Sequence, residues 1–412
     1  MIITINLYIM KKLIFLVLVG IGLCLTVISC SDDDGNINPD PEPVPVLPNH
    51  IVAIVENWND FGFNLLKEAA NSSEFGNTNF LISPMGVVQT YSMLANGAGD
   101  EMRKNIVAVL GYKDLDIKQV NELNKKFMGF VKKEDDSAVR YFANSVWTTT
   151  DIPVANDFCS AADIYYHTEI KEIGNQTFVA DINAWCNRST DGNIDTFIKD
   201  FEPVPDISVG NIVYFTGKWS VADKFDATKI EEGYFRDDNG NNSPVKFLKN
   251  KKNMRYYETA TMQKCALEFE GHSFMAAFIL PKEGVILSQA IDALVDGGWK
   301  QICYGLNEVV VDLSLPKFRV ESEIDLEKLV SDFSVADIMG ASSRDCVTIA
   351  KQKNVFELTE QKAQSWPGYI PDIKTSSDKE VTMTFDRPFI YVVYEQSTGA
   401  ILFAGCVNTF AD

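Results

Sequence analysis

The stretch that decides the fold reads NIVYFTGKW and spans residues 211–219. Its centre, residues 212–215, is a run of β-branched and aromatic residues, and Gly217 follows it. This pattern is typical of a buried strand that ends at a turn. Apolar runs of the same kind recur at residues 146–149, 274–280 and 309–313. Because these runs do not alternate between apolar and polar residues, we expect strands that are buried on both faces.

The first third of the domain predicts helices. Residues 52–66 carry apolar side chains at a helical spacing. Ser83 followed by Pro84 has the form of a helix N-cap and a first helical residue, and the apolar run 87–95 continues the helix until Gly97 ends it. Helices and buried strands in one chain indicate a large mixed α+β domain.

The body of the chain predicts a single domain, residues 50–412. A C-terminal hairpin is expected where the apolar runs 389–394 and 400–405 flank the turn 396–399.

The chain has 412 residues and a formal net charge of −20. Phosphate backbones and anionic lipids both attract basic surfaces, so we expect no nucleic-acid partner and no direct adhesion to a membrane.

The N-terminus has the form of an exported lipoprotein. Lys11 and Lys12 precede an apolar run that reaches Ile28, and the run ends in Val27-Ile28-Ser29-Cys30, which resembles a bacterial lipobox. We therefore expect residues 1–29 to be a signal peptide, Cys30 to be lipidated, and the acidic, Pro-rich residues 30–49 to be a tether. The alternative is an uncleaved membrane helix. Met10 offers an alternative start to Met1.

These features predict an exported protein, anchored by lipid to the outer membrane and the cell surface. Removal of residues 1–29 takes two lysines with it, so the formal net charge changes from −20 to −22.

No motif of a known catalytic centre is present. The sequence has no nucleophile elbow, no P-loop and no zinc-protease motif, and we expect His167 and His272 to be structural. A glycosidase-like pair of carboxylates is left open by spacing alone. No C-x-x-C pair exists, so we expect no metal site and no cofactor. The cysteines beyond Cys30 are expected to be buried thiols, with one or two disulfides left open.

One segment, residues 364–379, stands out as a long polar loop. It contains Pro367 and Pro371 and lies between two strand-like runs. A loop of this length in a compact domain is usually functional.

Seven motifs, in order along residues 50–410, resemble those of the serpin family. They are NFLISP (79–84) with Gly97-Ala98-Gly99, ANSVW (143–147), INAW (182–185), TDGNI (190–194), NIVYFTGKW (211–219) with Phe225 and Thr228, LPKF (315–318), and FDRPF (385–389) with Gly405.

The resemblance implies a fold of three β-sheets and about nine helices, with an exposed reactive-centre loop near the C-terminus. It implies a protease inhibitor rather than an enzyme. A target protease attacks the loop as a suicide substrate, and the cut loop inserts into the main sheet as a new central strand. The implied partners are serine or cysteine proteases of a host or of competing bacteria, and a monomer is expected.

The resemblance also assigns site residues. The reactive bond is expected among Lys374, Thr375, Ser376 and Ser377. The loop hinge corresponds to Glu360, Gln361, Lys362, Ala363, Gln364 and Ser365. The shutter, the polar region under the sheet that opens, corresponds to Ser83, Asn211 and Gln352, and Trp219 falls in the breach.

The sequence departs from the family pattern at several of these positions. Lys362 replaces the usual hinge glycine, and Pro367 and Pro371 lack the N–H group that a central strand needs. Gly86 stands where a serine is usual and Gln352 where a histidine is usual. The alternative function is therefore a serpin-fold binding protein on the bacterial surface that does not trap proteases.

Overall fold

A computed structural model describes residues 49–131, 138–149, 154–172, 174, 176–199, 203–220, 223–226, 228–304, 307–340, 347–358 and 379–410. The predicted signal peptide, hinge and reactive bond lie outside the described residues, as does the predicted tether except for Asn49, which is the first residue of helix α2 (Asn49–Asn71).

The described residues contain both helices and strands, as the sequence predicts. The helices are α2 (Asn49–Asn71), α3 (Pro84–Leu94), α4 (Asp100–Val109), α5 (Ile117–Val131), α6 (Asn156–Tyr166), α7 (Phe178–Ser189), α8 (Leu287–Ala293), the π-type turn η1 (Leu294–Gly298), α9 (Trp299–Tyr304), α10 (Leu326–Leu329) and α11 (Val335–Ile338). No helix among them is long and apolar enough to cross a bilayer.

The strands form two hydrogen-bonded sheets among the described residues. They are β1 (Phe80–Ile82), β2 (Ala138–Thr148), β3 (Glu169–Glu172), β4 (Ile207–Gly217), β5 (Ile230–Arg236), β6 (Asn242–Glu258), β7 (Met262–Glu268), β8 (Phe274–Pro281), β9 (Asn307–Pro316), β10 (Phe318–Asp325), β11 (Thr348–Leu358), β12 (Glu380–Thr384), β13 (Phe389–Glu395) and β14 (Ile401–Val407).

One sheet has the order β10-β11-β4-β2-β3 and the other β1-β14-β13-β8-β7-β6-β9-β12, with β5 paired to β6. The family resemblance implies three sheets. Two of them are joined here because β6, which is 17 residues long, pairs with β5, β9 and β7 along its length.

Helix α3 lies between the two sheets and is buried along its whole length. It packs against β14 of one sheet and β4 of the other. The predicted N-cap is confirmed, because the Ser83 hydroxyl accepts a hydrogen bond from the N–H of Gly86 at 3.1 Å and Pro84 opens the helix. The start of α3 is thereby fixed beneath the five-stranded sheet.

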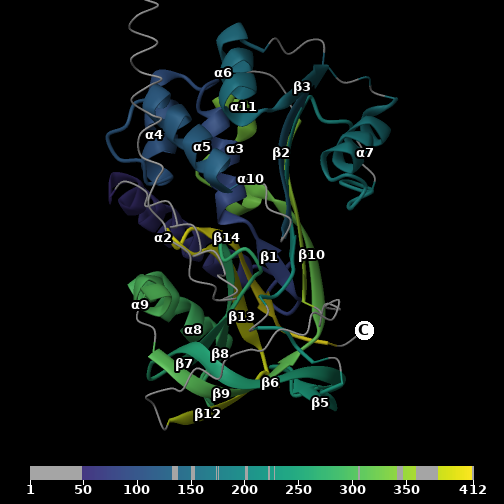
Figure 1. Ribbon diagram of the computed structural model, residues 1–412. Helices are drawn as coiled ribbons and strands as arrows, with labels where there is room; N and C mark the ends of the chain where they lie inside the picture. The colour runs from purple at the N-terminus through teal and green to yellow at the C-terminus, as the bar shows by residue number, and fades with distance from the viewer. Residues whose placement is uncertain are drawn as a thin grey trace, which may run out of the picture. The chain divides into compact units, whose positions relative to one another are not determined.

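The five-stranded sheet has a core on each face. Helices α3, α5 and α6 lie on one side of it, and α7 lies on the other (Figure 1). Trp185 and Ile182 of α7 pack with Trp147 of β2 and Ile212 of β4 in a small cluster of their own. The apolar runs at residues 146–149 of β2 and its exit and 212–215 of β4 therefore lie in strands that are covered on both faces.

The predicted C-terminal hairpin is also confirmed. Strands β13 and β14 pair in antiparallel register and every residue in them is buried. The turn between them contains Gly399 with φ of 72°, a conformation that favours glycine.

Candidate functional site

The site begins at a seam in the five-stranded sheet, which we define as the contact between β4 and β11. These strands pair in parallel from Ile207↔Thr348 to Tyr214↔Val355. Beyond that point β4 stays paired to β2 as far as Gly217, and β11 stays paired to β10 as far as Leu358. The seam therefore loses its pairing over the last three residues of each strand.

This unpaired end is where the candidate loop leaves the sheet. Strand β11 ends at Leu358, and the chain is next described at Lys379, which directly precedes β12. A segment that turned back after Leu358 into the seam would run antiparallel to both β4 and β11. Antiparallel neighbours are joined by a short turn, so the connection that this topology requires is an ordinary one.

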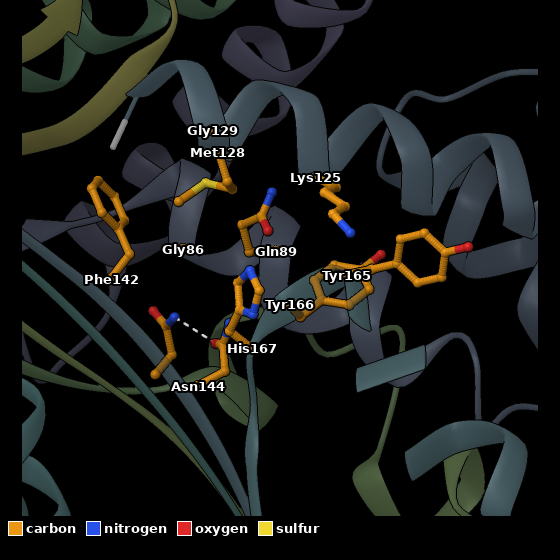
Figure 2. A pocket seen from close by; sticks show the side chains of 11 residues that line it. Gly86, Gln89, Lys125, Met128, Gly129, Phe142, Asn144, Tyr165, Tyr166 and His167 are labelled. Atoms are coloured by element: carbon orange, nitrogen blue, oxygen red, sulfur yellow. Dashed lines mark hydrogen bonds between the residues drawn. The ribbon is translucent and has the colours of Figure 1, made fainter. Parts of the chain in front are cut away.

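A row of amide side chains crosses the seam under the sheet. Gln352 of β11 lies directly opposite Asn211 of β4, and its Nε2 donates to Asn211 Oδ1 at 2.9 Å. Asn211 Nδ2 donates in turn to Asn144 Oδ1 of β2 at 2.8 Å (dashed line, Figure 2). All three side chains are buried. Separation of β4 from β11 must break the bond between Gln352 and Asn211.

The same row is tied to the start of α3. Gln352 Oε1 accepts from the N–H of Ser83 at 2.9 Å, and Gln352 Nε2 also donates to the carbonyl of Ser83 at 3.1 Å. The Ser83 hydroxyl donates to the carbonyl of Leu402 in β14 at 2.6 Å. We call Ser83, Asn144, Asn211 and Gln352 the seam network. It links both strands of the seam to a helix and to the second sheet.

Gly86 leaves room for this network. A Cβ atom at residue 86 would lie 2.4 Å from Asn211 Oδ1 and 2.5 Å from Gln352 Nε2. Contacts that short do not occur in folded proteins, so a side chain at this position would displace the amides. The sequence departs from the family pattern at residues 86 and 352. These two departures compensate each other, because the space that a side chain at residue 86 would fill is occupied by the seam amides, that of Gln352 included.

Trp219 lies just beyond the open end of the seam. Its ring stacks on Phe269, with centroids 4.5 Å apart and planes 13° apart, and Phe225 packs against its edge. The side chain is buried, and its backbone pairs with Phe269 in an isolated bridge. Trp219 thus joins the end of β4 to the neighbouring sheet.

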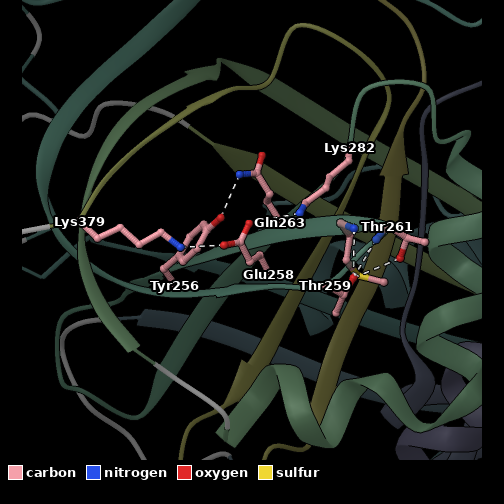
Figure 3. A network of polar contacts seen from close by, with 8 residues as sticks. Tyr256, Glu258, Thr259, Thr261, Gln263, Lys282 and Lys379 are labelled. Carbon is pink, nitrogen blue, oxygen red and sulfur yellow. Dashed lines mark hydrogen bonds and ion pairs between the residues drawn. The ribbon is translucent and has the colours of Figure 1, made fainter. Parts of the chain in front are cut away.

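Ion pairs hold the chain at the C-terminal end of the loop, and we call them the ionic anchor. Lys379 Nζ lies 2.7 Å from Glu258 Oε1, and Lys282 Nζ lies 3.2 Å from Oε2 of the same carboxylate (Figure 3). The ammonium of Lys379, and next that of Lys282, lower the pKa of Glu258 to about 2. Beyond Lys379, β12 pairs in parallel with β9.

The described residues offer no cluster of three or more His, Cys, Asp or Glu side chains that could hold a metal ion. His272 lies at the surface beside Glu268, with 2.8 Å between Nδ1 and Oε2. The cysteines in the described part of the chain are free thiols, and all are buried except the half-buried Cys159. Cys346 lies outside the described residues.

Comparison with known proteins identifies the family. The family model described as serpin (serine protease inhibitor) matches residues 56–409. The chain is a serpin. It is 25% identical over 368 residues to a serpin-like protein of Thermococcus kodakarensis, with 85% of this chain and 84% of the relative covered. It is also 25% identical to the plasma serine protease inhibitor of Mus musculus, covering 85% of this chain and 89% of that one.

Solved structures show the same fold for this serpin. The thermophilic serpin tengpin in its native state matches with a TM-score of 0.77 at 22% identity, over 91% of this chain and 98% of the other. Human thyroxine-binding globulin matches with a TM-score of 0.76 at 20% identity, over 88% of this chain and 100% of the other. The predicted α+β serpin fold is thereby confirmed.

Of the predicted site residues in this serpin, the structure brings Ser83, Asn211 and Gln352 into direct contact, and it places Trp219 beside the seam. The hinge residues 360–365, the reactive-bond residues 374–377 and Cys30 lie outside the described residues. Sequence reasoning missed Asn144, which completes the seam network, and the anchor of Lys379 on Glu258. The ANSVW motif contains Asn144 and was the available signal.

Proposed function

We propose that this serpin inhibits proteases as a suicide substrate. The serine or cysteine nucleophile of the protease attacks a carbonyl in residues 374–377. The peptide bond at that carbonyl breaks, its amine leaves as the new N-terminus of the C-terminal segment, and the carbonyl stays bound to the protease as an acyl-enzyme. The part of the loop 360–379 that precedes the cut then inserts between β4 and β11. The new strand carries the protease away from the position in which it completes hydrolysis. The protease performs the chemical step, so the serpin itself needs no acid, base, metal or cofactor and is not an enzyme.

The observation that carries this proposal is the loss of pairing at the end of the seam. The unpaired residues of β4 and β11 lie where the loop leaves Leu358. A strand that enters there pairs first with main-chain groups that have no partner in the other strand, and it then replaces the bonds between β4 and β11 progressively. The first step of insertion therefore breaks no hydrogen bond between β4 and β11.

Buried polar groups without hydrogen bonds support a metastable native sheet. Within the described residues they include Ser145 Oγ and Trp147 Nε1 of β2, Ser208 Oγ of β4 and Asn354 Oδ1 of β11. Each unsatisfied buried group costs on the order of 1–3 kcal/mol. Two of these groups, on Ser208 and Asn354, lie on the strands that must separate, and the other two lie on the neighbouring strand β2. Unsatisfied groups in this sheet are the expected signature of a folded state that rearrangement can relax.

The second candidate is a serpin-fold binding protein that does not trap proteases. Lys362, Pro367 and Pro371 favour it, because a lysine restricts the hinge and each proline removes one donor from an inserted strand. The loss of a buried ladder bond costs on the order of 1–3 kcal/mol, and two losses slow or stop insertion.

One experiment separates the two candidates. The intact serpin is mixed with a trypsin-like and an elastase-like protease, and a denaturant-resistant complex is sought on gels. The suicide mechanism predicts this complex and, for any nicked protein, a higher melting temperature. Plain binding predicts nicked protein with an unchanged melting temperature. Mass spectrometry of the C-terminal fragment, taken after denaturation, should place the cut within residues 372–378.

We further propose that the mature protein is a monomer, anchored through lipidated Cys30 to the outer membrane and exposed at the cell surface. Supporting this are the lipobox-like residues 27–30, the acidic tether 30–49 and a single domain that follows from residue 50. Its net negative charge should steer basic proteases of a host or of competing bacteria toward it. An association rate that does not change with salt would contradict this steering.

A further inference from the structure

A surface pocket of about 260 Å³ lies where the turn between β5 and β6 meets the end of β8, the start of α8 and the residues that precede β13. Its apolar lining comes from Pro281, Val285, Leu287 and Pro388. All four are buried or half-buried, so they form the floor. The volume exceeds the roughly 150 Å³ of an engineered cavity that binds benzene, so a small organic ligand fits. None of the described lining residues belongs to the seam network or to the ionic anchor.

Backbone hydrogen bonds preform the walls of this pocket. The N–H of Gly240 donates to the carbonyl of Asp237 at 2.9 Å and closes the turn after β5, and Gly240 has a φ of 83°, a conformation that favours glycine. The N–H of Arg236 donates to the carbonyl of Asp386 at 2.7 Å and fixes the end of β5 beside the segment that precedes β13. The two walls are therefore held in place relative to each other, as is usual in small-molecule sites.

Two of the charged side chains in the lining are held by the protein itself. The carboxylate of Asp237 accepts from the N–H of Asn241 at 2.8 Å and from Asn241 Nδ2 at 2.9 Å. The guanidinium of Arg387 donates to the carbonyl of Pro281 from Nε at 3.2 Å and from Nη2 at 2.8 Å, and its Nη1 lies 2.9 Å from Asp386 Oδ1. Both side chains therefore shape the pocket and offer no free charge to a ligand.

The other two charged side chains of the lining, Arg236 and Asp238, lie on either side of Asp237 in the sequence and are exposed. Within the described part of the chain, neither makes an ion pair or a side-chain hydrogen bond with another residue. Partial loss of solvent, and next the charge of Asp237, raise the pKa of Asp238, so a cation beside this carboxylate is favourable. The pocket thus offers one free positive and one free negative charge above an apolar floor.

We propose that this pocket binds a free aliphatic α-amino acid, for which L-leucine is the model. Its carboxylate accepts charge-assisted hydrogen bonds from the guanidinium of Arg236, and its ammonium group donates to the carboxylate of Asp238. Its side chain packs on Val285 and Leu287, where apolar surface is removed from water. A ligand with only one of the two charges leaves either Arg236 or Asp238 without a partner, so the lining favours a zwitterion. Binding of this ligand needs neither the loop nor a protease and is independent of the proposed function.

Binding is tested on the intact protein with L-leucine and with probes that each lack one of its features. Isocaproate lacks the ammonium group, isoamylamine lacks the carboxylate, and glycine lacks the aliphatic side chain. Titration by ¹H–¹⁵N NMR should give a Kd on the order of 1 mM for leucine, as expected for a ligand of this size, and should shift the amide signals of Gly240 and Val285. Each of the other probes should bind about tenfold more weakly.

Two variants at exposed positions test the two charges separately. Arg236→Gln should weaken leucine binding about tenfold and abolish isocaproate binding, and it should leave isoamylamine unchanged because this amine has no group for the guanidinium. Asp238→Asn should weaken leucine to the same extent, abolish isoamylamine binding and leave isocaproate unchanged. Lys246→Gln and Glu232→Gln, at exposed residues of the same hairpin that do not line the pocket, are the matched controls and should change none of these affinities.

Leucine binding that neither Arg236→Gln nor Asp238→Asn weakens would overturn the proposal, as would the absence of leucine binding to the wild-type protein. Equal affinities for leucine and isocaproate, or an effect of only one of the two variants, would overturn the zwitterion. Equal affinities for leucine and glycine would overturn the role of the apolar floor. Because both variants alter exposed side chains, the melting temperature should stay unchanged, which separates a loss of binding from a loss of folding.

Discussion

The carboxamide of Gln352 occupies the space into which a side chain at Gly86 would project, since a Cβ there would lie 2.5 Å from Gln352 Nε2. The glycine at the start of α3 and the glutamine in β11 are thus a complementary pair. The pair places a polar, uncharged group at the centre of the seam network.

Gly86→Ala should lower the free energy of unfolding by about 1–3 kcal/mol, because the added methyl group overpacks the seam network. In a Gln352→Ala background the same change should cost at least about 0.5 kcal/mol less. Urea unfolding of the four proteins of this cycle measures both values. Gly129→Ala is the matched control and should not destabilise, because a Cβ there meets nothing within 4 Å. Additive effects of the two mutations would contradict the pairing.

Ser208→Ala should raise the free energy of unfolding by about 1 kcal/mol, because it removes a buried hydroxyl that has no hydrogen-bond partner. It should also slow loop insertion, since Ser208 lies on β4 in the seam. Thermal unfolding and the rate of heat-resistance gain after nicking measure the two effects. Ser322→Ala is the contrasting variant. Its hydroxyl accepts from the N–H of Leu81 at 3.0 Å, so its loss should destabilise.

Pro367→Ala should speed insertion about tenfold if it restores one ladder bond in the new strand. The measured quantity is the fraction of protein that forms a denaturant-resistant complex rather than nicked product. Pro203→Ala, at an exposed position in the connection that precedes β4, should leave this fraction unchanged. A Pro367→Ala protein that yields no more complex than the wild type would show that the proline does not limit insertion.

The carboxyl group of Glu258 should titrate near pH 2, and Lys379→Met should move its pKa toward the usual 4.5. Because the pKa is lowered by folding, the anchor contributes stability above pH 4.5 and loses it as the pH falls toward 2. NMR titration of the side-chain carboxyl carbon measures this directly. Lys251→Met, which removes the ion pair with Glu380, is the control and should leave Glu258 in place.

Burial lowers the pKa of Lys264 to about 8, and its Nζ donates to the carbonyl of Ile302 at 2.6 Å. Between about pH 8 and 10.5 the unfolded chain holds this proton and the folded chain has lost it, so this group makes stability rise with pH. Lys264→Met should remove that rise from the alkaline profile of unfolding free energy. Lys246→Met, at an exposed lysine, should leave the profile unchanged.

Sequence reasoning predicted the fold well because its motifs lie in buried strands and at the cap of α3. The segment 211–219 forms most of β4 and its exit, and Ser83 caps α3 as expected. The resemblance implied three sheets, and among the described residues two of them are continuous because β6 pairs with β5, β7 and β9 along its length. Asn144 and Glu258 were missed since each acts through partners far away in the sequence, and such contacts are set by register.

Strands β13 and β14 lie inside the nine-stranded sheet and are completely buried. They follow the loop, so any scission between residues 359 and 378 leaves them behind as part of a second polypeptide. That polypeptide stays bound to the rest of the molecule through these two buried strands. Protein that has been cut without trapping a protease therefore sheds no fragment and keeps its mass in native chromatography, and its two chains separate only in denaturant.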